Sequence, residues 1–213
     1  MTSFDHEGFW SARYRDAGDD YLFGTAPNRF LAARARLLES GRNALSIADG
    51  EGRNSVWLAE LGLAVTATEI SPVALEKARK LAAGRHVEVD FVAADVLSSS
   101  WPPPEYTAAF DFVIGIFIQF ATPAERPQLF AGLKRAVKPG GLLLLQGYTP
   151  KQLEYRTGGP SSEANLYTRE LLVDLFRDFE IVELSEHEDV LDEGRAHNGH
   201  SALIDLVARR PVA

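Results

Sequence analysis

The sequence predicts a doubly wound α/β domain, in which a mostly parallel sheet is covered by helices on both faces. Short apolar segments rich in β-branched residues alternate with segments of helical periodicity, and the connections between them are short. Near the C-terminal end, two strand-like segments follow each other without a helix. The chain has 213 residues, enough to bury a substantial core, and we expect residues 1–213 to form a single domain.

The first part of the chain predicts three strands separated by helices. Apolar residues at helical spacing, followed by Gly41 or Gly62, indicate two helices that end at a glycine. Ser71 and Pro72 indicate the start of a third helix, because serine caps helices and proline is favoured in their first turn. The expected helices cover residues 28–40, 54–61 and 72–83, and the expected strands cover residues 44–48, 64–70 and 87–93.

The second part of the chain predicts four more strands. Residues 98–104 (SSSWPPP) are expected to form a loop, because proline is excluded from central strands and helix interiors. The segment 139–141 (PGG) is expected to turn a helix into the next strand. The expected helices cover residues 123–137 and 169–176, and the expected strands cover residues 110–116, 142–147, 180–190 and 201–209. The last two strands are joined only by a loop, so we expect an antiparallel pair after five parallel strands.

Composition and charge exclude several classes of protein. The absence of cysteine excludes a disulfide framework and a cysteine-ligated zinc site. A net charge of -8 repels phosphate backbones, so we expect no nucleic-acid partner. The first residues have no signal-peptide pattern and no apolar run is long enough to span a bilayer. We therefore expect a cytoplasmic protein without a membrane partner.

A glycine loop and two acidic residues stand at the ends of the first three expected strands. Gly50 and Gly52 permit a tight turn and a close approach of a ligand to the backbone. Glu69 could accept hydrogen bonds from both hydroxyls of a ribose, while Asp95 and the Val96 N–H could bind an adenine. Taken singly, these features could be an ordinary turn, a surface acid and a loop or capping aspartate. Because ligands of such sheets bind at the carboxyl ends of strands, together they predict a nucleotide site.

The sequence around these residues resembles a known family. The segment 44–82 is similar to the first two motifs of class I S-adenosylmethionine-dependent methyltransferases, and GEGRNSVWLA within it resembles the tellurite-resistance and thiopurine-type branch. KPGGLLLLQGYTP and the tail GRAHNGHSALIDLVARRP resemble the fifth and final strands of that branch. The resemblance implies S-adenosylmethionine as methyl donor and S-adenosylhomocysteine as its product. It also implies a Rossmann-like, doubly wound, seven-stranded sheet that is mostly parallel, with an antiparallel last strand.

Two positions depart from the family pattern. Ser46 stands where relatives have an acid, which leaves open how the loop is organised, and Ala48 replaces their first glycine. Asp49 could lie near the ammonium group of the cofactor or could cap the following helix. The residues expected to contact the cofactor are Trp10, Arg13, Tyr14, Ala48, Asp49, Gly50, Gly52, Asn54, Glu69, Ile70, Asp95, Val96, Gly115 and Ile116.

The N-terminal segment is dense in aromatic residues. In relatives such a segment folds over the cofactor, so residues 1–27 are expected to form a lid and residues 28–213 the core. Trp10 and Tyr14 could then pack on the cofactor, and Arg13 could pair with its carboxylate. The alternative is a helix whose Trp10 and Tyr14, one turn apart, simply dock on the core.

Methyl transfer requires alignment and exclusion of water, and it requires a general base only where the acceptor is not already ionised. The segment GIFIQF lacks the Asn/Asp-Pro-Pro-aromatic motif of enzymes that methylate nucleobases or amides, which disfavours those acceptors. Gln119, His197 and His200 are candidates for the acceptor site, with an ordinary loop or capping role as the alternative, and Tyr21 is a further candidate. The histidines and the run 186–188 (EHE) make a metal site conceivable, but we expect none.

The predicted function is a methyltransferase that acts on a sulfur, oxygen or metalloid atom of a small molecule, as a monomer or homodimer. A NAD(P)-dependent oxidoreductase is the first alternative, although Ser55 stands where the third glycine of its dinucleotide motif would be. A non-catalytic cofactor-binding protein is the second alternative, because Ser46 and Ala48 depart from the family pattern.

Overall fold

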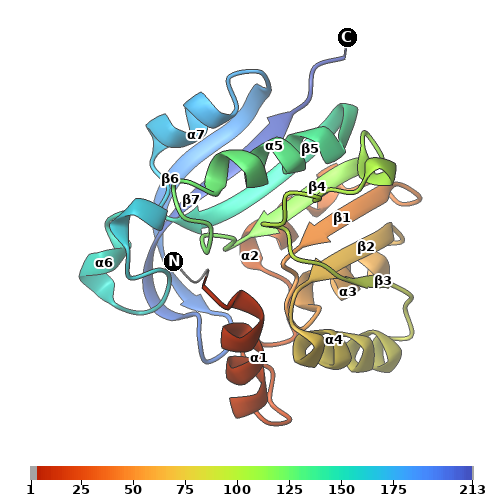
Figure 1. The fold of residues 1–213 in the computed structure, drawn as a ribbon, viewed down its shortest axis with the longest axis vertical. Helices are drawn as coiled ribbons and strands as arrows, with labels where there is room; N and C mark the ends of the chain where they lie inside the picture. The colour runs from red at the N-terminus through yellow and green to blue at the C-terminus, as the bar shows by residue number, and fades with distance from the viewer. Residues whose placement is uncertain (1–3, 213) are drawn as a thin grey trace.

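A computed structural model of the chain describes residues 4–212. Its sheet has seven strands in the order β3-β2-β1-β4-β5-β7-β6 (Figure 1). The strands are β1 (Asn43–Ile47), β2 (Ala64–Glu69), β3 (Asp90–Ala93), β4 (Phe110–Ile116), β5 (Val137–Tyr148), β6 (Glu180–Asp192) and β7 (Asn198–Arg209). The helices are α1 (His6–Asp16), α2 (Arg29–Ala32), α3 (Arg53–Glu60), α4 (Pro72–Arg85), α5 (Arg126–Ala136), α6 (Gln152–Tyr155) and α7 (Arg169–Leu175), with short 3-10 turns η1 (Ala35–Leu37), η2 (Pro104–Tyr106) and η3 (Glu163–Asn165).

The direction of the strands confirms the predicted fold class. Strands β1 to β5 are mutually parallel, and β7 pairs antiparallel with both β5 and β6. Strand β6 therefore runs parallel to the first five, and β7 alone is reversed. The two C-terminal strands form the expected antiparallel pair, and the last strand of the chain is the antiparallel one.

Two apolar cores lie on opposite faces of the sheet. On one face, Phe130 and Leu133 of α5 and Phe176 pack against Leu143 and Leu145 of β5. The other face carries the second core, in which residues of α2 and α3 pack on alternate residues of β4 and β5. The helix residues are Phe30, Leu31 and Leu58, and the strand residues are Phe112, Ile114, Leu142 and Leu144. Side chains alternate between the faces along a strand, so the continuous apolar runs of β4 and β5 supply both cores.

Three of the differences between the predicted and the observed boundaries have a local cause. The helix expected over residues 28–40 is limited to α2 followed by the turn η1. The Arg34 guanidinium donates to the Phe30 carbonyl (2.9 Å), and the backbone leaves the helical path at Arg34. Strand β3 begins only at Asp90, because α4 continues to Arg85 and its left-handed cap at His86 delays the strand.

The segment 139–141 forms part of β5 instead of a separate turn. The Gly140 N–H donates to the Arg210 carbonyl (2.8 Å) and the Arg210 N–H donates to the Gly141 carbonyl (2.9 Å), which joins this segment to the end of the chain. The left-handed backbone of Gly140 (φ +78°) and a register shift between β4 and β5 absorb the bend.

The parallel strands end at one edge of the sheet, where α1 also lies beside α4 (Figure 1). The Lys77 ammonium of α4 donates to the Tyr14 carbonyl of α1 (3.0 Å), and the Ser11 and Ser71 hydroxyls are 2.9 Å apart. Within residues 4–212, no helix is both long and apolar enough to cross a membrane.

Candidate cofactor and acceptor site

A cavity with an empty volume of about 800 Å³, part of it open to solvent, lies at the carboxyl ends of β1 to β4. A space of this size is typical of a small-molecule or cofactor site. The cavity is lined by His6, Trp10, Tyr14, Phe23, Ala48, Asp49, Gly50, Arg53, Asn54, Glu69, Ile70, Ala94, Asp95, Val96, Leu97, Ile116, Phe117, Phe120 and His197. Eleven residues that the sequence singled out for the cofactor are among them: Trp10, Tyr14, Ala48, Asp49, Gly50, Asn54, Glu69, Ile70, Asp95, Val96 and Ile116.

The loop between β1 and α3 has left-handed backbone at Ala48 (φ +45°), Gly50 (φ +64°) and Gly52 (φ +90°). A Cβ at Gly50 would lie 2.8 Å from the Tyr14 hydroxyl, and a Cβ at Gly52 would lie 2.8 Å from the Ala78 Cβ. Gly50 therefore faces the cavity, while Gly52 allows α3 to pack closely on α4. Ala48 occupies a conformation that glycine adopts with less strain.

The Asp49 carboxylate lies inside this loop. It accepts a hydrogen bond from the Ser46 hydroxyl (2.6 Å) and another from the Ser55 hydroxyl in the first turn of α3. Burial raises the pKa of Asp49, while the two serine hydroxyls act in the opposite direction. Ser46, which replaces the usual acid, thus becomes a donor to an acid three residues later. Asp49 binds the start of α3 and also lines the cavity, so its two predicted roles are compatible.

Glu69 is a buried carboxylate at the end of β2, with 4% of its surface exposed. One of its oxygens accepts the Gly50 N–H (2.9 Å) and the other accepts the Ser71 N–H (2.8 Å). Burial raises the pKa of Glu69, and the nearby Asp49 carboxylate also raises it. Each oxygen keeps a lone pair after these contacts, so the carboxylate can still accept two hydroxyl groups.

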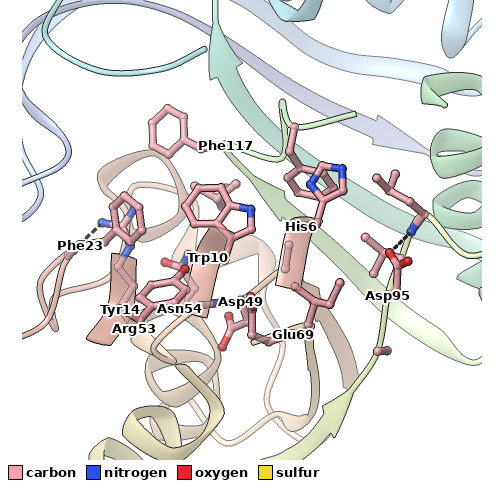
Figure 2. A pocket seen from close by; sticks show the side chains of 18 of the residues that line it. His6, Trp10, Tyr14, Phe23, Asp49, Arg53, Asn54, Glu69, Asp95 and Phe117 are labelled. Atoms are coloured by element: carbon pink, nitrogen blue, oxygen red, sulfur yellow. Dashed lines mark hydrogen bonds between the residues drawn. The ribbon is translucent and has the colours of Figure 1, made fainter. Parts of the chain in front are cut away.

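Asp95 and Val96 follow β3, the strand next to the one that ends at Glu69. Glu69 is paired with Ala93 in the parallel register of β2 and β3, which brings Asp95 to the same edge. The Asp95 carboxylate accepts the Leu97 N–H (2.9 Å), and this contact fixes the turn. Figure 2 shows Glu69 between Asp49 and Asp95, with the rings of Trp10 and His6 above them in this view.

Helix α1 supplies the aromatic cover of the cavity. Tyr14 is buried and stacks with Trp10 (centroids 6.0 Å apart, rings inclined by 28°). Arg13 is not among the lining residues and lies over the Phe9 and Trp10 rings, 5.7 and 5.2 Å from their centroids. The helix is thus docked on the core and also lies over the cavity. Residues 1–3 and 213 of the expected lid and domain lie outside the described residues.

His197, in the turn between β6 and β7, reaches the opposite end of the cavity. Its ring contacts Phe23 (centroids 4.5 Å) and Phe117 (4.3 Å) and lies 5.9 Å from Tyr148. Burial, together with the Arg53 and Arg13 charges, lowers the pKa of His197 to about 3. The imidazole is therefore neutral at physiological pH.

The other expected site residues lie away from the cavity. The Gln119 amide donates to the Tyr148 carbonyl (2.9 Å) and accepts the Tyr148 N–H (2.6 Å), so it ties two backbone segments together. The Tyr21 hydroxyl donates to the Lys77 carbonyl (3.1 Å). His200 is exposed beside Tyr155. Gly115 packs against Ile118, where a Cβ would lie 2.9 Å from Cδ1. Among residues 4–212, no group of three or more metal-binding side chains occurs.

Seven residues that sequence reasoning did not assign to the cofactor or the acceptor also line the cavity: His6, Phe23, Arg53, Ala94, Leu97, Phe117 and Phe120. Arg53 forms a buried ion pair with Glu193, its Nη1 atom 2.7 Å from the Glu193 carboxylate. Glu193 in turn accepts hydrogen bonds from Asn28 and from the Arg29 N–H. Position directly after the glycine loop or after β4 could have indicated Arg53 and Phe117, whereas His6 and Phe23 lie in the segment 1–27 that the sequence predicted as a lid.

A model of a methyltransferase domain family matches residues 44–141, a little under half of the chain. An uncharacterized methyltransferase from Synechocystis sp. (strain PCC 6803) is 29% identical over 109 residues, which are 51% of this chain and 48% of that protein. The chain thus spans about half the length of the curated relative it matches.

Solved structures share the fold over nearly the whole chain. One structure concerns the conversion of a disulfide bond into a thioacetal group during echinomycin biosynthesis. It has a TM-score of 0.76 at 22% identity, and the match covers 96% of this chain and 92% of that chain. A SAM-dependent methyltransferase from Anabaena variabilis has a TM-score of 0.72 at 17% identity, and the match covers 96% of this chain and 93% of that chain. TehB from Haemophilus influenzae has a TM-score of 0.69 at 18% identity, and the match covers 96% of this chain and 66% of that chain. The domain match and the shared fold support the resemblance to class I SAM-dependent methyltransferases, without singling out one branch.

Proposed function

We propose that this chain is an S-adenosylmethionine-dependent methyltransferase that acts on a sulfur, oxygen or metalloid atom of a small molecule. The observation that carries the proposal is the placement of Asp49, Glu69 and Asp95, which follow three adjacent strands and line one cavity. The methyltransferase-domain match includes all three residues. The tellurite-resistance and thiopurine-type branch remains part of the proposal, as do a single domain, a cytoplasmic location and a monomeric or homodimeric state.

The residues present fit an adenosyl group with an amino-acid tail. Glu69 would hold the ribose, because its buried carboxylate retains lone pairs for two hydroxyls. Asp95 and the Val96 N–H would hold the adenine, at the end of the neighbouring strand. Asp49 and the backbone of Gly50 would lie near the tail, where a carboxylate suits an ammonium group.

S-adenosylmethionine supplies, when bound, a methyl group attached to a positively charged sulfur. A nucleophile with a lone pair can attack the methyl carbon in line with the carbon–sulfur bond, and the sulfur is the leaving group. The chain's own residues align the reactants and exclude water. Ile116 ends β4 and Phe117 follows it, and both line the cavity. Trp10 of α1 and Phe120 of the loop after β4 also line it. The comparisons do not favour the alternatives of a NAD(P)-dependent oxidoreductase or a non-catalytic protein.

Calorimetry with four ligands tests this proposal. S-adenosylmethionine and S-adenosylhomocysteine are expected to bind the purified protein, whereas NAD⁺ and NADP⁺ are not. Turnover would then be followed as release of S-adenosylhomocysteine with thiols, phenols and selenite as acceptors. Tight binding of NAD⁺ or NADP⁺, or no binding of S-adenosylhomocysteine, would overturn the proposal.

A further inference from the structure

A buried ion pair joins the glycine loop to helix α4. Glu51, which lies between Gly50 and Gly52, pairs with Lys77 of α4 (carboxylate Oε1 to ammonium Nζ, 2.8 Å). The Lys77 side chain is 12% exposed and the Glu51 side chain is 2% exposed. Neither residue is among those that line the cavity. Buried charges need close partners to offset their lost hydration, so each of these two groups must stay beside the atoms that bind it.

The other hydrogen bonds of this ion pair reach the N-terminal segment. The Lys77 ammonium donates to the Tyr14 carbonyl (3.0 Å) and to the Asp20 carbonyl (2.8 Å). The second oxygen of Glu51 accepts the Leu22 N–H (2.7 Å). A lysine ammonium has three donors, and together with Glu51 these two carbonyls take all of them. We call Glu51 and Lys77 the clamp, because they fix both the last turn of α1 and the loop after it.

Helix α1 has few other polar attachments. Within residues 4–212, two hydrogen bonds join α1 to parts of the chain that are distant in sequence. One is the bond from Lys77 to the Tyr14 carbonyl, and the other is the contact between the Ser11 and Ser71 hydroxyls (2.9 Å). The remaining contacts of the helix are made by apolar and aromatic side chains. The clamp therefore supplies one of the two polar attachments of α1, and it also holds the loop behind the helix.

Helix α1 lies over the place expected for the tail of the cofactor. Trp10 and Tyr14 of α1 line the cavity together with Asp49 and Gly50 of the glycine loop. A Cβ at Gly50 would lie 2.8 Å from the Tyr14 hydroxyl, so this hydroxyl is close to the backbone of the loop. A cofactor tail bound beside Asp49 and Gly50 would therefore contact side chains of α1.

We propose that the clamp holds α1 closed over the bound cofactor and thereby limits the rate at which the cofactor enters and leaves. The inference rests on the proposed methyltransferase function, because it requires a cofactor in this cavity. Glu51 and Lys77 are positioning residues, since they act through Tyr14 and the glycine loop. Glu51 joins the loop that binds the tail to the segment that covers it. Breaking the clamp increases the population of the open arrangement, so the cofactor leaves sooner.

The kinetics of S-adenosylhomocysteine binding test the clamp without requiring an acceptor. Trp10 lines the cavity, so the change in tryptophan fluorescence after rapid mixing gives the association and dissociation rate constants. Lys77→Met is expected to raise the dissociation rate constant at least tenfold, with an association rate constant no lower than that of the wild type. The double variant Glu51→Gln and Lys77→Met leaves no buried charge unpaired and should show the same increase. Lys80→Met is the matched control, because Lys80 lies on the same helix in an exposed ion pair with Glu76, and its rate constants should stay within twofold.

An engineered disulfide tests the opposite change, in which α1 is locked closed. The chain has no cysteine, and the Ser11 and Ser71 hydroxyls are in contact. Ser11→Cys combined with Ser71→Cys can therefore form a single disulfide between α1 and the start of α4. The oxidised protein is expected to bind and release S-adenosylhomocysteine at least tenfold more slowly than the same protein after reduction with dithiothreitol. Equal rates before and after reduction would show that α1 does not have to open, which overturns the proposal.

The same measurements separate the clamp from a purely structural role and from the proposed function. A lowered melting temperature of Lys77→Met with an unchanged dissociation rate constant would show that the ion pair only stabilises the fold, and would overturn the clamp. Failure of S-adenosylhomocysteine to bind the wild-type protein would contradict the proposed function. Normal binding by the wild type, with equal rate constants in Lys77→Met, would contradict only the clamp.

Discussion

The two ends of the cavity use polar groups in opposite ways. At the cofactor end, the Asp49 and Glu69 carboxylates are buried and each receives two or more hydrogen bonds from the chain itself. At the other end, which we call the acceptor end, the buried ring of His197 packs between the Phe23 and Phe117 rings. The cofactor end is therefore organised by hydrogen bonds, whereas the acceptor end is organised by aromatic packing. The hydrogen-bonded carboxylates of the cofactor end thus form a fixed frame for a ligand.

The Arg53–Glu193 ion pair joins the two ends, and breaking it should have the largest effect. Arg53→Met leaves the Glu193 carboxylate buried without its cation, so we expect the free energy of unfolding to fall by about 3–5 kcal/mol. Urea denaturation measures this change. Arg85→Met, which breaks the more exposed contact with Glu60, should change stability by about 0–1 kcal/mol. Similar effects for the two variants would show that Arg53 does not stabilise the frame.

Removal of the ribose carboxylate should act on the cofactor end alone. Glu69→Ala is expected to weaken S-adenosylhomocysteine binding by about 1–3 kcal/mol, because charge-assisted hydrogen bonds to the ribose are lost. Calorimetry measures the change. Glu76→Ala, on the solvent-exposed side of α4, is the control. Unchanged affinity in a folded Glu69→Ala protein would place the ribose elsewhere.

The acceptor end should have a distinct pH dependence. The pKa of His197 is about 3 in the folded chain and about 6.5 when unfolded, so the unfolded chain takes up the proton first as the pH falls. The stabilisation is complete above pH 6.5 and decreases below it, by about 2 kcal/mol at pH 5. Asp49 and Glu69, whose pKa values are raised, contribute with the opposite sign. The difference between wild type and His197→Gln in urea denaturation therefore isolates His197, and a pH-independent difference would refute its neutral state.

The smallest effect concerns the loop of the cofactor end. Ala48 has a left-handed backbone (φ +45°), so Ala48→Gly should raise the free energy of unfolding by about 1 kcal/mol. Ala44→Gly in β1 should be destabilising, because that residue is extended and fully buried. Thermal denaturation of both variants gives the comparison. A loss of stability in Ala48→Gly would show that the departure from glycine carries no strain.

The cofactor end was predictable from the sequence because strand ends are predictable. Apolar runs located β1, β2 and β3, and the carboxyl ends of adjacent parallel strands share an edge, so Glu69 and Asp95 were brought together by topology alone. Ser46 could not be interpreted, because its compensation by Asp49 depends on a hydrogen bond within the folded loop.

The acceptor end was only partly predictable, because its residues come from loops. His197 was a candidate, but its contact with Phe23 and Phe117 joins segments that are far apart in the chain. Gln119 was a candidate for the acceptor site, with a loop or capping role as the alternative, and the left-handed backbone of Phe117 (φ +56°) redirects the chain after β4. Gln119 consequently turns toward the backbone of Tyr148.

A crystal structure with bound S-adenosylhomocysteine tests the central claim most directly. The account predicts both ribose hydroxyls within hydrogen-bond distance of the Glu69 carboxylate, the adenine beside Asp95 and Val96, and the sulfur directed toward Phe117 and His197. An adenosyl group bound away from Glu69 and Asp95, or no bound nucleoside at saturating concentration, would contradict it.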